Sequence, residues 1–198
     1  KLAEYALQSH VDSSEQPVGT WFALPDNVTN IKGQEFSQSH PCLIFGLENA
    51  KNGVIQVLEG HRVFHSLSVE DNLLIGTYAN SPNGDRSKLG RIYELFPEMA
   101  ERKQQMASRL SGGQQQILAV AQGVIGDPKL LILDEPSSGL APIVIDRILD
   151  VATKLCQQGL AILLVEQLVD KALSHAHYGY LMETGRIVAS AFSDELRE

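Results

Sequence analysis

The chain has 198 residues, of which 43% are apolar, and its formal net charge at pH 7 is −8. This length can bury the core of one compact domain, while the acidic balance, with no stripe of Lys or Arg, argues against a nucleic-acid partner. Cys42 and Cys156 stand alone, without the spacing of metal ligands, so the sequence predicts reduced thiols in a cytosolic protein.

Neither a membrane span nor a secretion signal is expected. No apolar run approaches the length of a membrane span, and the first residues, Lys1–Leu7, contain too few apolar residues for a secretion signal. The sequence therefore predicts a soluble protein, which leaves open a place on a membrane partner.

Residues 1–52 differ in composition from the rest of the chain. Short apolar pieces, Trp21–Leu24 and Cys42–Phe45, stand between serines, asparagines and prolines. This pattern indicates a small strand-rich or irregular region, an atypical N-terminal region whose fold stays unassigned.

Two short helices are predicted next. Ser68–Asp71 has the residues of a capping box, and Leu89–Phe96 is expected to form a second helix that ends at Pro97. Asn80–Gly84, which lies between them, has the composition of a turn.

A third helix is preceded by two glycines. Apolar residues recur at three- and four-residue steps over residues 117–125, and Gly126–Pro128 supplies a stop. Because Gly112 and Gly113 lack side chains, the backbone N–H groups at the helix start can approach an anion closely, helped by the positive end of the helix dipole. Ser111 adds a hydroxyl donor, so we expect a phosphate contact at this helix end.

An acidic strand end follows this helix. Lys129–Leu133 is a short apolar run with branched residues, which suits a strand covered on both faces of a parallel sheet. Asp134 and Glu135 come where the strand ends, and ligands in open α/β sheets bind at the carboxyl ends of strands. One carboxylate there can hold Mg²⁺, directly or through water, and its neighbour can orient or deprotonate an attacking water.

The rest of the chain predicts one more helix, one more strand and a hairpin. Pro142 can occupy the first turn of a helix with one apolar face. Ala161–Val165 is predicted to be another buried strand. Glu183–Arg186 is expected to be the turn of a hairpin between Tyr178–Met182 and Ile187–Ala189.

These motifs resemble those of the ATP-binding subunits of ABC transporters. Leu110–Gln114 reads LSGGQ, the family's signature motif, and Leu130–Glu135 resembles its Walker B motif, four apolar residues followed by Asp-Glu. Ser137–Pro142 resembles the family's D-loop in a form similar to that of the branched-chain amino-acid importers. Three further segments resemble the same importers: Glu59–Phe64, Val69–Leu73 and Leu164–Gln167.

The resemblance covers about residues 53–198 and implies an α/β fold of the P-loop-NTPase type found in ABC ATPases. The expected architecture is a mostly parallel sheet with helices on both faces and a helical subdomain at about residues 66–112. An ABC-type nucleotide-binding domain, residues 53–198, would then follow the atypical N-terminal region, residues 1–52.

The resemblance also implies ATP and Mg²⁺ as cofactors. Asp134 would hold the metal and Glu135 would be catalytic. Gln167 stands where much of the superfamily has a switch histidine, and it would act in catalysis as a hydrogen-bonding amide that cannot carry a positive charge. Glu59 stands at the Q-loop position as a candidate nucleotide contact. The signature residues would contact ATP: Ser111, Gly112, Gly113 and Gln114.

The phosphate loop of the family is not recognisable in the sequence. No glycine is followed by Lys-Ser or Lys-Thr in the spacing G-x-x-x-x-G-K-[S/T]. The nearest segment, Leu43–Lys51, lacks the second glycine and the Ser or Thr that would hold magnesium, and it carries Glu48 where an anion would sit. We therefore predict a strand and a turn there. The chain is also shorter than we expect for a complete subunit of this family.

The sequence thus predicts an ATP-binding subunit of an ABC importer, for branched-chain amino acids or similar small solutes, that lacks a recognisable Walker A motif. The implied partners are a second ABC ATP-binding subunit, in a homo- or heterodimer, and membrane permease subunits at the inner face of the cell membrane. In such a dimer the signature segment of this chain would complete the ATP site of its partner. Two alternatives stay open: a non-catalytic interaction or scaffold protein, and a truncated or recombined product without ATPase activity.

Overall fold

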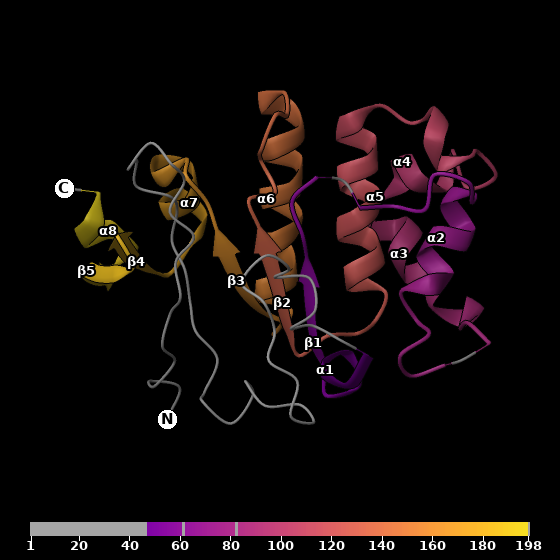
Figure 1. Cartoon of the computed structure of the whole chain (residues 1–198), viewed down its shortest axis with the longest axis horizontal. Helices are drawn as coiled ribbons and strands as arrows, with labels where there is room; N and C mark the ends of the chain where they lie inside the picture. Colours follow the sequence, from indigo (N-terminus) through magenta and orange to yellow (C-terminus); the bar gives the residue numbers. More distant parts are fainter. Residues whose placement is uncertain (1–46, 61, 82, 198) are drawn as a thin grey trace. The chain divides into compact units, whose positions relative to one another are not determined.

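The computed structural model describes residues 47–60, 62–81 and 83–197. The described part of the chain divides into two compact units, one of residues 47–163 and one of residues 164–197. In the described residues, the first unit contains parallel strands and a group of helices, and the second contains an antiparallel hairpin with short helices (Figure 1).

The parallel strands form one sheet in the order β1 (Val54–Val57), β2 (Leu130–Asp134) and β3 (Ala161–Val165). β1 and β2 run parallel, with Val54 opposite Leu130 at one end of the ladder. The three middle residues of β2 are buried, which confirms the predicted strand covered on both faces.

β3 is a strand as predicted, but it is not a buried one. Only Val165 at its end is buried, whereas Ala161 is exposed and the residues between them are half-buried. The prediction of a second buried strand is therefore wrong. Both β2 and β3 are continuous apolar runs. Among the described strands of this sheet, however, β3 lies at the edge, so its residues are less buried than those of β2.

Helix α5 (Gly112–Val124) covers one face of β1 and β2. Gly123 makes this approach close, because an added Cβ there would lie 2.9 Å from a side-chain atom of β1 and 3.1 Å from one of β2. Since side chains alternate between the two faces of a strand, Gln56 and Asp134 lie on the opposite face of the sheet.

The helices that precede α5 form the expected helical subdomain. Ser68 is the N-cap residue of α2 (Val69–Ile75), and its Oγ accepts a hydrogen bond from the Asp71 N–H at 3.1 Å, as predicted. The reciprocal half of the predicted capping box is not formed, since Asp71 Oδ2 accepts from the Ser68 hydroxyl at 2.6 Å. α3 (Leu89–Leu95) ends one residue earlier than predicted, and the next proline begins α4 (Pro97–Ala100). Two 3₁₀ helices complete this part: Arg86–Lys88 and Ala107–Arg109. Side chains at most 2% exposed form its core: Val69, Leu73, Ile92, Phe96, Met99 and Leu118.

Helix α6 (Pro142–Gln157) begins at the predicted proline. Arg147 joins α6 to the helical subdomain, since its Nε donates to Glu98 Oε1 at 3.0 Å and its Nη2 donates to Glu98 Oε2 at 3.2 Å and to the Leu95 carbonyl at 2.6 Å. Its guanidinium also lies 5.7 Å from the centre of the Phe96 ring. The buried face of α6 carries Ile145, Ile148, Leu149, Val151 and Leu155.

The segment before β1 differs from the prediction. Leu47–Lys51 forms the short helix α1, so the prediction of a strand and a turn is wrong for these residues, while residues 43–46 lie outside the described part. The five residues of α1 include no β-branched side chain, which favours a helical turn. Gly53, with φ at +88°, then turns the chain into β1.

The second unit continues from β3 into α7 (Val169–His175), the strands β4 (Tyr178–Glu183) and β5 (Arg186–Phe192), and α8 (Ser193–Leu196). β4 and β5 pair in an antiparallel ladder around a two-residue turn, as predicted, and both turn residues have positive φ, +43° at Thr184 and +76° at the following glycine.

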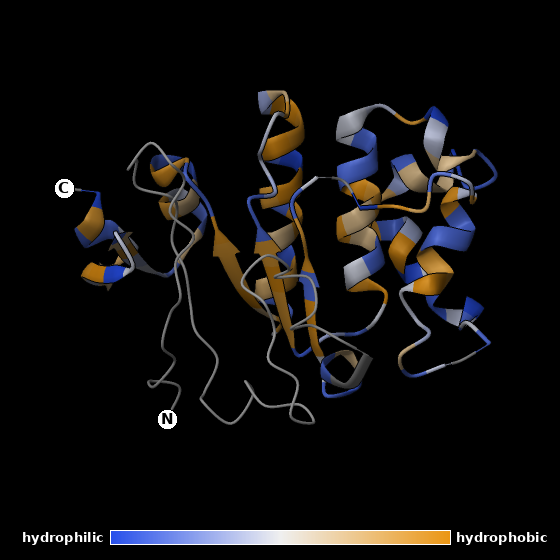
Figure 2. Cartoon of the chain, viewed as in Figure 1, coloured by the Kyte–Doolittle hydropathy of each residue, from blue (hydrophilic) through white to orange (hydrophobic). Residues whose placement is uncertain are grey.

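Hydropathy follows this architecture. Figure 2 shows β2 and β3 as hydrophobic strands, whereas hydrophilic and hydrophobic residues alternate along the helices of the helical subdomain. In the described part of the chain, no helix is both long and apolar enough to cross a membrane.

Candidate functional site

The carboxyl end of β2 carries the two predicted acids. Asp134 is the last residue of the strand, and Glu135 follows it with φ at +43°, a conformation that side chains other than glycine rarely adopt. Such a residue costs on the order of 1–3 kcal/mol and persists where its surroundings hold it, often at functional sites. The backbone thus turns sharply at Glu135, and both carboxylates are only partly buried.

Side chains from three segments meet around these acids. Gln56 of β1 donates from Nε2 to Asp134 Oδ2 at 3.2 Å. Ser138, in the D-loop segment, donates from Oγ to Glu59 Oε1 at 2.8 Å. The structure therefore connects the predicted Q-loop acid to the D-loop, and the predicted metal ligand to a residue that the sequence analysis did not select.

Electrostatics at Asp134 favour a bound cation. Burial raises the pKa of this carboxyl above its ordinary value, the charge of Glu135 raises it further, the hydrogen bond from Gln56 lowers it, and the charge of Glu59 raises it again. A raised pKa means that the surroundings destabilise the ionised carboxylate. A bound cation would stabilise it. The donor set therefore suits Mg²⁺.

That ion would draw few of its ligands from protein side chains. Within residues 47–60, 62–81 and 83–197, no three His, Cys, Asp or Glu side chains form a group that could hold a metal. Mg²⁺ commonly uses one or two carboxylates together with waters and substrate phosphates. Asp134 would be the carboxylate here.

The signature segment forms the start of α5. Ser111 is the N-cap residue: its Oγ accepts from the Gln114 N–H at 3.3 Å, and Gln114 Oε1 accepts from the Ser111 N–H at 3.0 Å. This reciprocal pair is a capping box that the sequence analysis did not predict. Two predicted phosphate contacts thus also fix the first turn of their own helix.

The glycines of the signature segment remain suited to an anion. Ser111 and Gly112 are exposed. The N–H groups of Gly112 and Gly113 belong to the first helical turn, where an α-helix offers no intrahelical acceptor. Gly113 also needs to be small, since an added Cβ would lie 2.9 Å from Val144 Cγ2. The helix start can therefore present two amides and the Ser111 hydroxyl to a phosphate.

Gln167 lies in the second unit, directly after β3. Its side chain is exposed, its carbonyl accepts from the Val169 N–H at 2.9 Å, and the preceding Glu166 is only 5% exposed. Its role in catalysis stays a prediction.

Gln56 is the functional candidate that the sequence analysis missed. It is a polar residue inside the otherwise apolar strand Val54–Val57, and this break in the pattern was the available signal. Only the register of β1 against β2 shows that Gln56 shares a face with Asp134.

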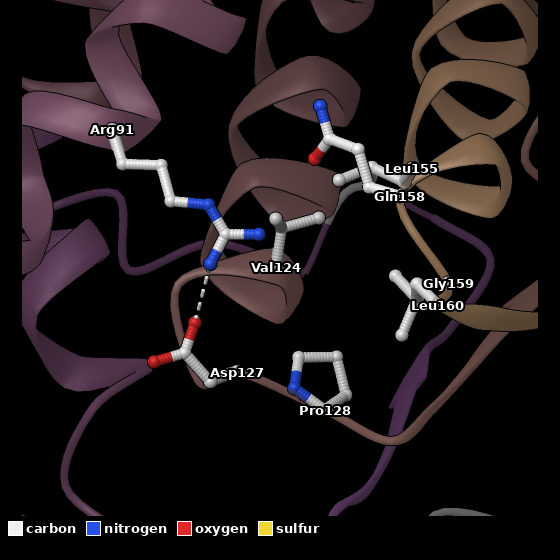
Figure 3. Close-up of a pocket in the computed structure, with 8 residues that line it drawn as sticks. All are labelled: Arg91, Val124, Asp127, Pro128, Leu155, Gln158, Gly159 and Leu160. Carbon is white, nitrogen blue, oxygen red and sulfur yellow. Dashed lines mark hydrogen bonds and ion pairs between the residues drawn. The ribbon is translucent and has the colours of Figure 1, made fainter.

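A separate hollow of about 300 Å³ lies at the other end of the strands. Figure 3 shows Arg91 paired with Asp127 on its wall, with Pro128 and Leu160 nearby. Pro128 and Leu160 come just before β2 and β3, so this hollow lies at the amino ends of these strands, away from Asp134. It is not the site of the predicted chemistry.

Comparison with known proteins agrees with this geometry. Residues 26–138 match the profile of the ABC transporter family. The high-affinity branched-chain amino acid transport ATP-binding protein BraG of Pseudomonas aeruginosa is 42% identical over 138 residues, which are 70% of this chain and 59% of that protein. The probable branched-chain amino acid transport ATP-binding protein LivF of Archaeoglobus fulgidus is 35% identical over 152 residues, 75% of this chain and 63% of that protein.

A solved structure shows the same fold. The ADP conformation of MJ1267, an ATP-binding cassette of an ABC transporter, superimposes with a TM-score of 0.66 at 22% identity, over 76% of this chain and 65% of that one. The chain spans less than two thirds of the length of these relatives. The predicted P-loop-NTPase-like α/β fold is confirmed, and the chain belongs to the ABC transporter family.

Proposed function

We propose that this chain acts as an ATP-binding subunit of an ABC importer and that its signature segment completes the ATP site of a second ATP-binding subunit. The glycine-lined start of α5 carries this proposal, because Ser111 and Gly112 are exposed and the amides of the first helical turn have no acceptor within their own helix. The names of the relatives support branched-chain amino acids, or similar small solutes, as the cargo.

The proposal also gives a role to the acids at the end of β2. Mg²⁺, when bound with ATP, neutralises charge on the phosphates. Asp134 would hold that ion, Glu135 would orient or deprotonate the attacking water, and Gln167 would donate a hydrogen bond to phosphate or water. Glu59, bonded to Ser138, would link the nucleotide to the loop that follows the acids.

A permease surface is also part of the proposal. Phe64 is 52% exposed, yet its backbone is fixed by the fully buried Asn72: the Phe64 N–H donates to Asn72 Oδ1 at 2.7 Å, and Asn72 Nδ2 donates to the Phe64 carbonyl at 3.0 Å. An exposed aromatic ring on a rigid loop is a typical anchor at protein interfaces. We assign Phe64 to contact with a membrane permease subunit, which would locate the protein at the inner face of the cell membrane.

The test mixes this chain with a complete ATP-binding subunit of the same importer type and measures ATP hydrolysis. Gly112→Asp should abolish any stimulation of the partner, because a carboxylate at the helix start repels phosphate. The same charge favours the helix, so the fold should survive. Gly90→Asp is the matched control, since Gly90 is exposed on α3 and an added Cβ meets nothing within 4 Å.

The result decides between the proposal and the scaffold alternative. Stimulation by the unsubstituted chain and by Gly90→Asp, with loss in Gly112→Asp, supports the signature role. Association without stimulation in all three proteins contradicts it and favours a non-catalytic ABC-like scaffold, an alternative that the missing phosphate-loop pattern motivates.

A further inference from the structure

Gln56 is a polar residue in a place where the sheet otherwise carries apolar side chains. Its neighbours on β1 are Val54, Ile55 and Val57. In the parallel ladder Gln56 lies opposite Ile132, and Asp134 follows two residues later on the same face. The long side chain of Gln56 can therefore reach the end of β2 without leaving the sheet surface.

The two polar atoms of this amide are in different situations. Nε2 donates to Asp134 Oδ2 at 3.2 Å. Oε1 is buried and has no hydrogen-bond partner among the described residues. A buried acceptor of this kind in a native structure calls for an explanation, and an ion or a water held by a ligand is one of the ordinary ones.

The orientation of the amide follows from charge. Only Nε2 can donate, so an ionised Asp134 carboxylate attracts the NH₂ group and turns Oε1 the other way. Because Oδ2 is held by Gln56, the carboxylate is fixed in one orientation and Oδ1 keeps its lone pairs. Carboxylates that bind metals are commonly fixed by such an outer hydrogen bond.

We propose that Gln56 is a positioning residue for the divalent cation of this site: through its Nε2 hydrogen bond it holds the Asp134 carboxylate so that Oδ1 meets the cation. This inference rests on the proposed assignment of Asp134 to Mg²⁺. It goes further by giving a role to a residue outside the recognised motifs. The signature segment takes no part in it.

The experiment is a double-mutant cycle on the affinity for Mn²⁺, a paramagnetic substitute for Mg²⁺. Free Mn²⁺ is measured by electron paramagnetic resonance without nucleotide, because unbound ATP itself chelates Mn²⁺, for the unsubstituted chain, Gln56→Met, Asp134→Asn and the double variant. Methionine keeps the length of glutamine but removes the amide. Loss of an outer hydrogen bond to a metal ligand typically weakens metal binding by about 10–100-fold, and we expect about tenfold for Gln56→Met.

The cycle distinguishes positioning from a merely structural bond. If Gln56 acts through Asp134, Gln56→Met should weaken Mn²⁺ binding in the parent but should have no further effect in the Asp134→Asn background. An equal loss in both backgrounds overturns the proposal, as does an unchanged affinity in Gln56→Met or the failure of the unsubstituted chain to take up Mn²⁺. Gln105→Met is the control, because the side-chain amide of Gln105 donates to the Arg109 carbonyl at 3.2 Å and stands far along the chain from β1.

A second measurement serves if Gln56→Met fails to fold. The side-chain NH₂ resonances of Gln56, observed by ¹⁵N NMR in the otherwise unsubstituted protein, should shift in Asp134→Asn and broaden when Mn²⁺ is added. If the protein takes up Mn²⁺ but these resonances do not broaden, the proposal is overturned. Neither experiment depends on Gly112, so the signature role can fail or stand independently.

Discussion

Asp134 shows how a single residue at the end of β2 is held at a cost to stability. Burial, Glu135 and Glu59 each raise its pKa, and only the hydrogen bond from Gln56 acts in the opposite direction. A carboxyl whose pKa is higher in the folded than in the unfolded state destabilises the fold whenever it is ionised. The negative charge of Asp134 does not stabilise the fold. Its presence is better explained by a bound ligand.

Asp134→Asn should be more stable than the parent at pH 7. Between the ordinary pKa of 3.8 and the higher folded-state pKa, the folded protein binds more protons than the unfolded chain, so the parent gains stability as the pH falls through this window. The advantage of Asp134→Asn should thus be full above the folded pKa and shrink toward pH 4. Urea denaturation at several pH values measures it, and an advantage that grows on acidification would contradict the assignment.

Glu70→Gln provides the opposite trend as a control. The hydrogen bond from Arg86, 2.7 Å long, lowers the pKa of Glu70 below its ordinary value, against the effect of burial. Its contribution to stability is present above the unfolded pKa and is lost as the pH falls through the folded pKa. Glu70→Gln should therefore be less stable than the parent at pH 7, with the difference fading in acid.

Urea denaturation should also show the backbone strain at Glu135. Glycine adopts a φ of +43° without the steric cost borne by other residues, so Glu135→Gly should stabilise the fold by about 0.5–1 kcal/mol. Glu135→Gln keeps the strain and should stay within about 0.5 kcal/mol of the parent. Thr184→Gly, at the same φ in the hairpin turn, is the reference for a site without a proposed catalytic role. A clear loss of stability in Glu135→Gly would disprove the strain.

Elements with local signals were predictable from the sequence. The cap at Ser68, the proline that begins α6 and the hairpin turn at Thr184 depend on residues a few positions apart, and all three are present. The motif order also led to the correct fold, because a glycine-led helix followed by an apolar strand and two acids is a specific combination.

Elements and contacts without local signals were not predictable. The pairs Gln56 with Asp134 and Ser138 with Glu59 join residues 78 and 79 positions apart, and they depend on strand order and register. α1 was missed because an apolar run and a glycine suggested a strand and a turn. β3 was expected to be buried because composition does not tell an edge strand from a central one.

Arg147 should be the strongest polar link between elements in the first unit. Arg147→Lys keeps the charge but loses the paired hydrogen bonds to Glu98 and the contact with the Phe96 ring, and we expect a loss of about 1–2 kcal/mol in the free energy of unfolding. Arg91→Lys is the control: its pair with Asp127 is about half exposed on each side, so the change should stay within about 0.5 kcal/mol. Equal effects in the two variants would contradict this ranking.

At the scale of the whole molecule, the proposed function assigns both the phosphate contact and the cation site to the first unit. The start of α5 offers amides for a phosphate, and the end of β2 offers carboxylates for a cation and a water. The phosphate-loop pattern is absent from the sequence, so the isolated chain should bind ATP weakly. Its signature segment is therefore the part that we expect to work in a complex with a second subunit.

The most direct test of this account is ATP-dependent association, measured by analytical ultracentrifugation. The chain is mixed with a complete ATP-binding subunit of a branched-chain importer whose catalytic glutamate has been replaced by glutamine, so that bound ATP is not consumed. The account predicts a complex that forms only with ATP and Mg²⁺, that persists in Gly90→Asp and that is lost in Gly112→Asp. A complex that forms equally well without ATP, or that survives Gly112→Asp unchanged, would contradict it.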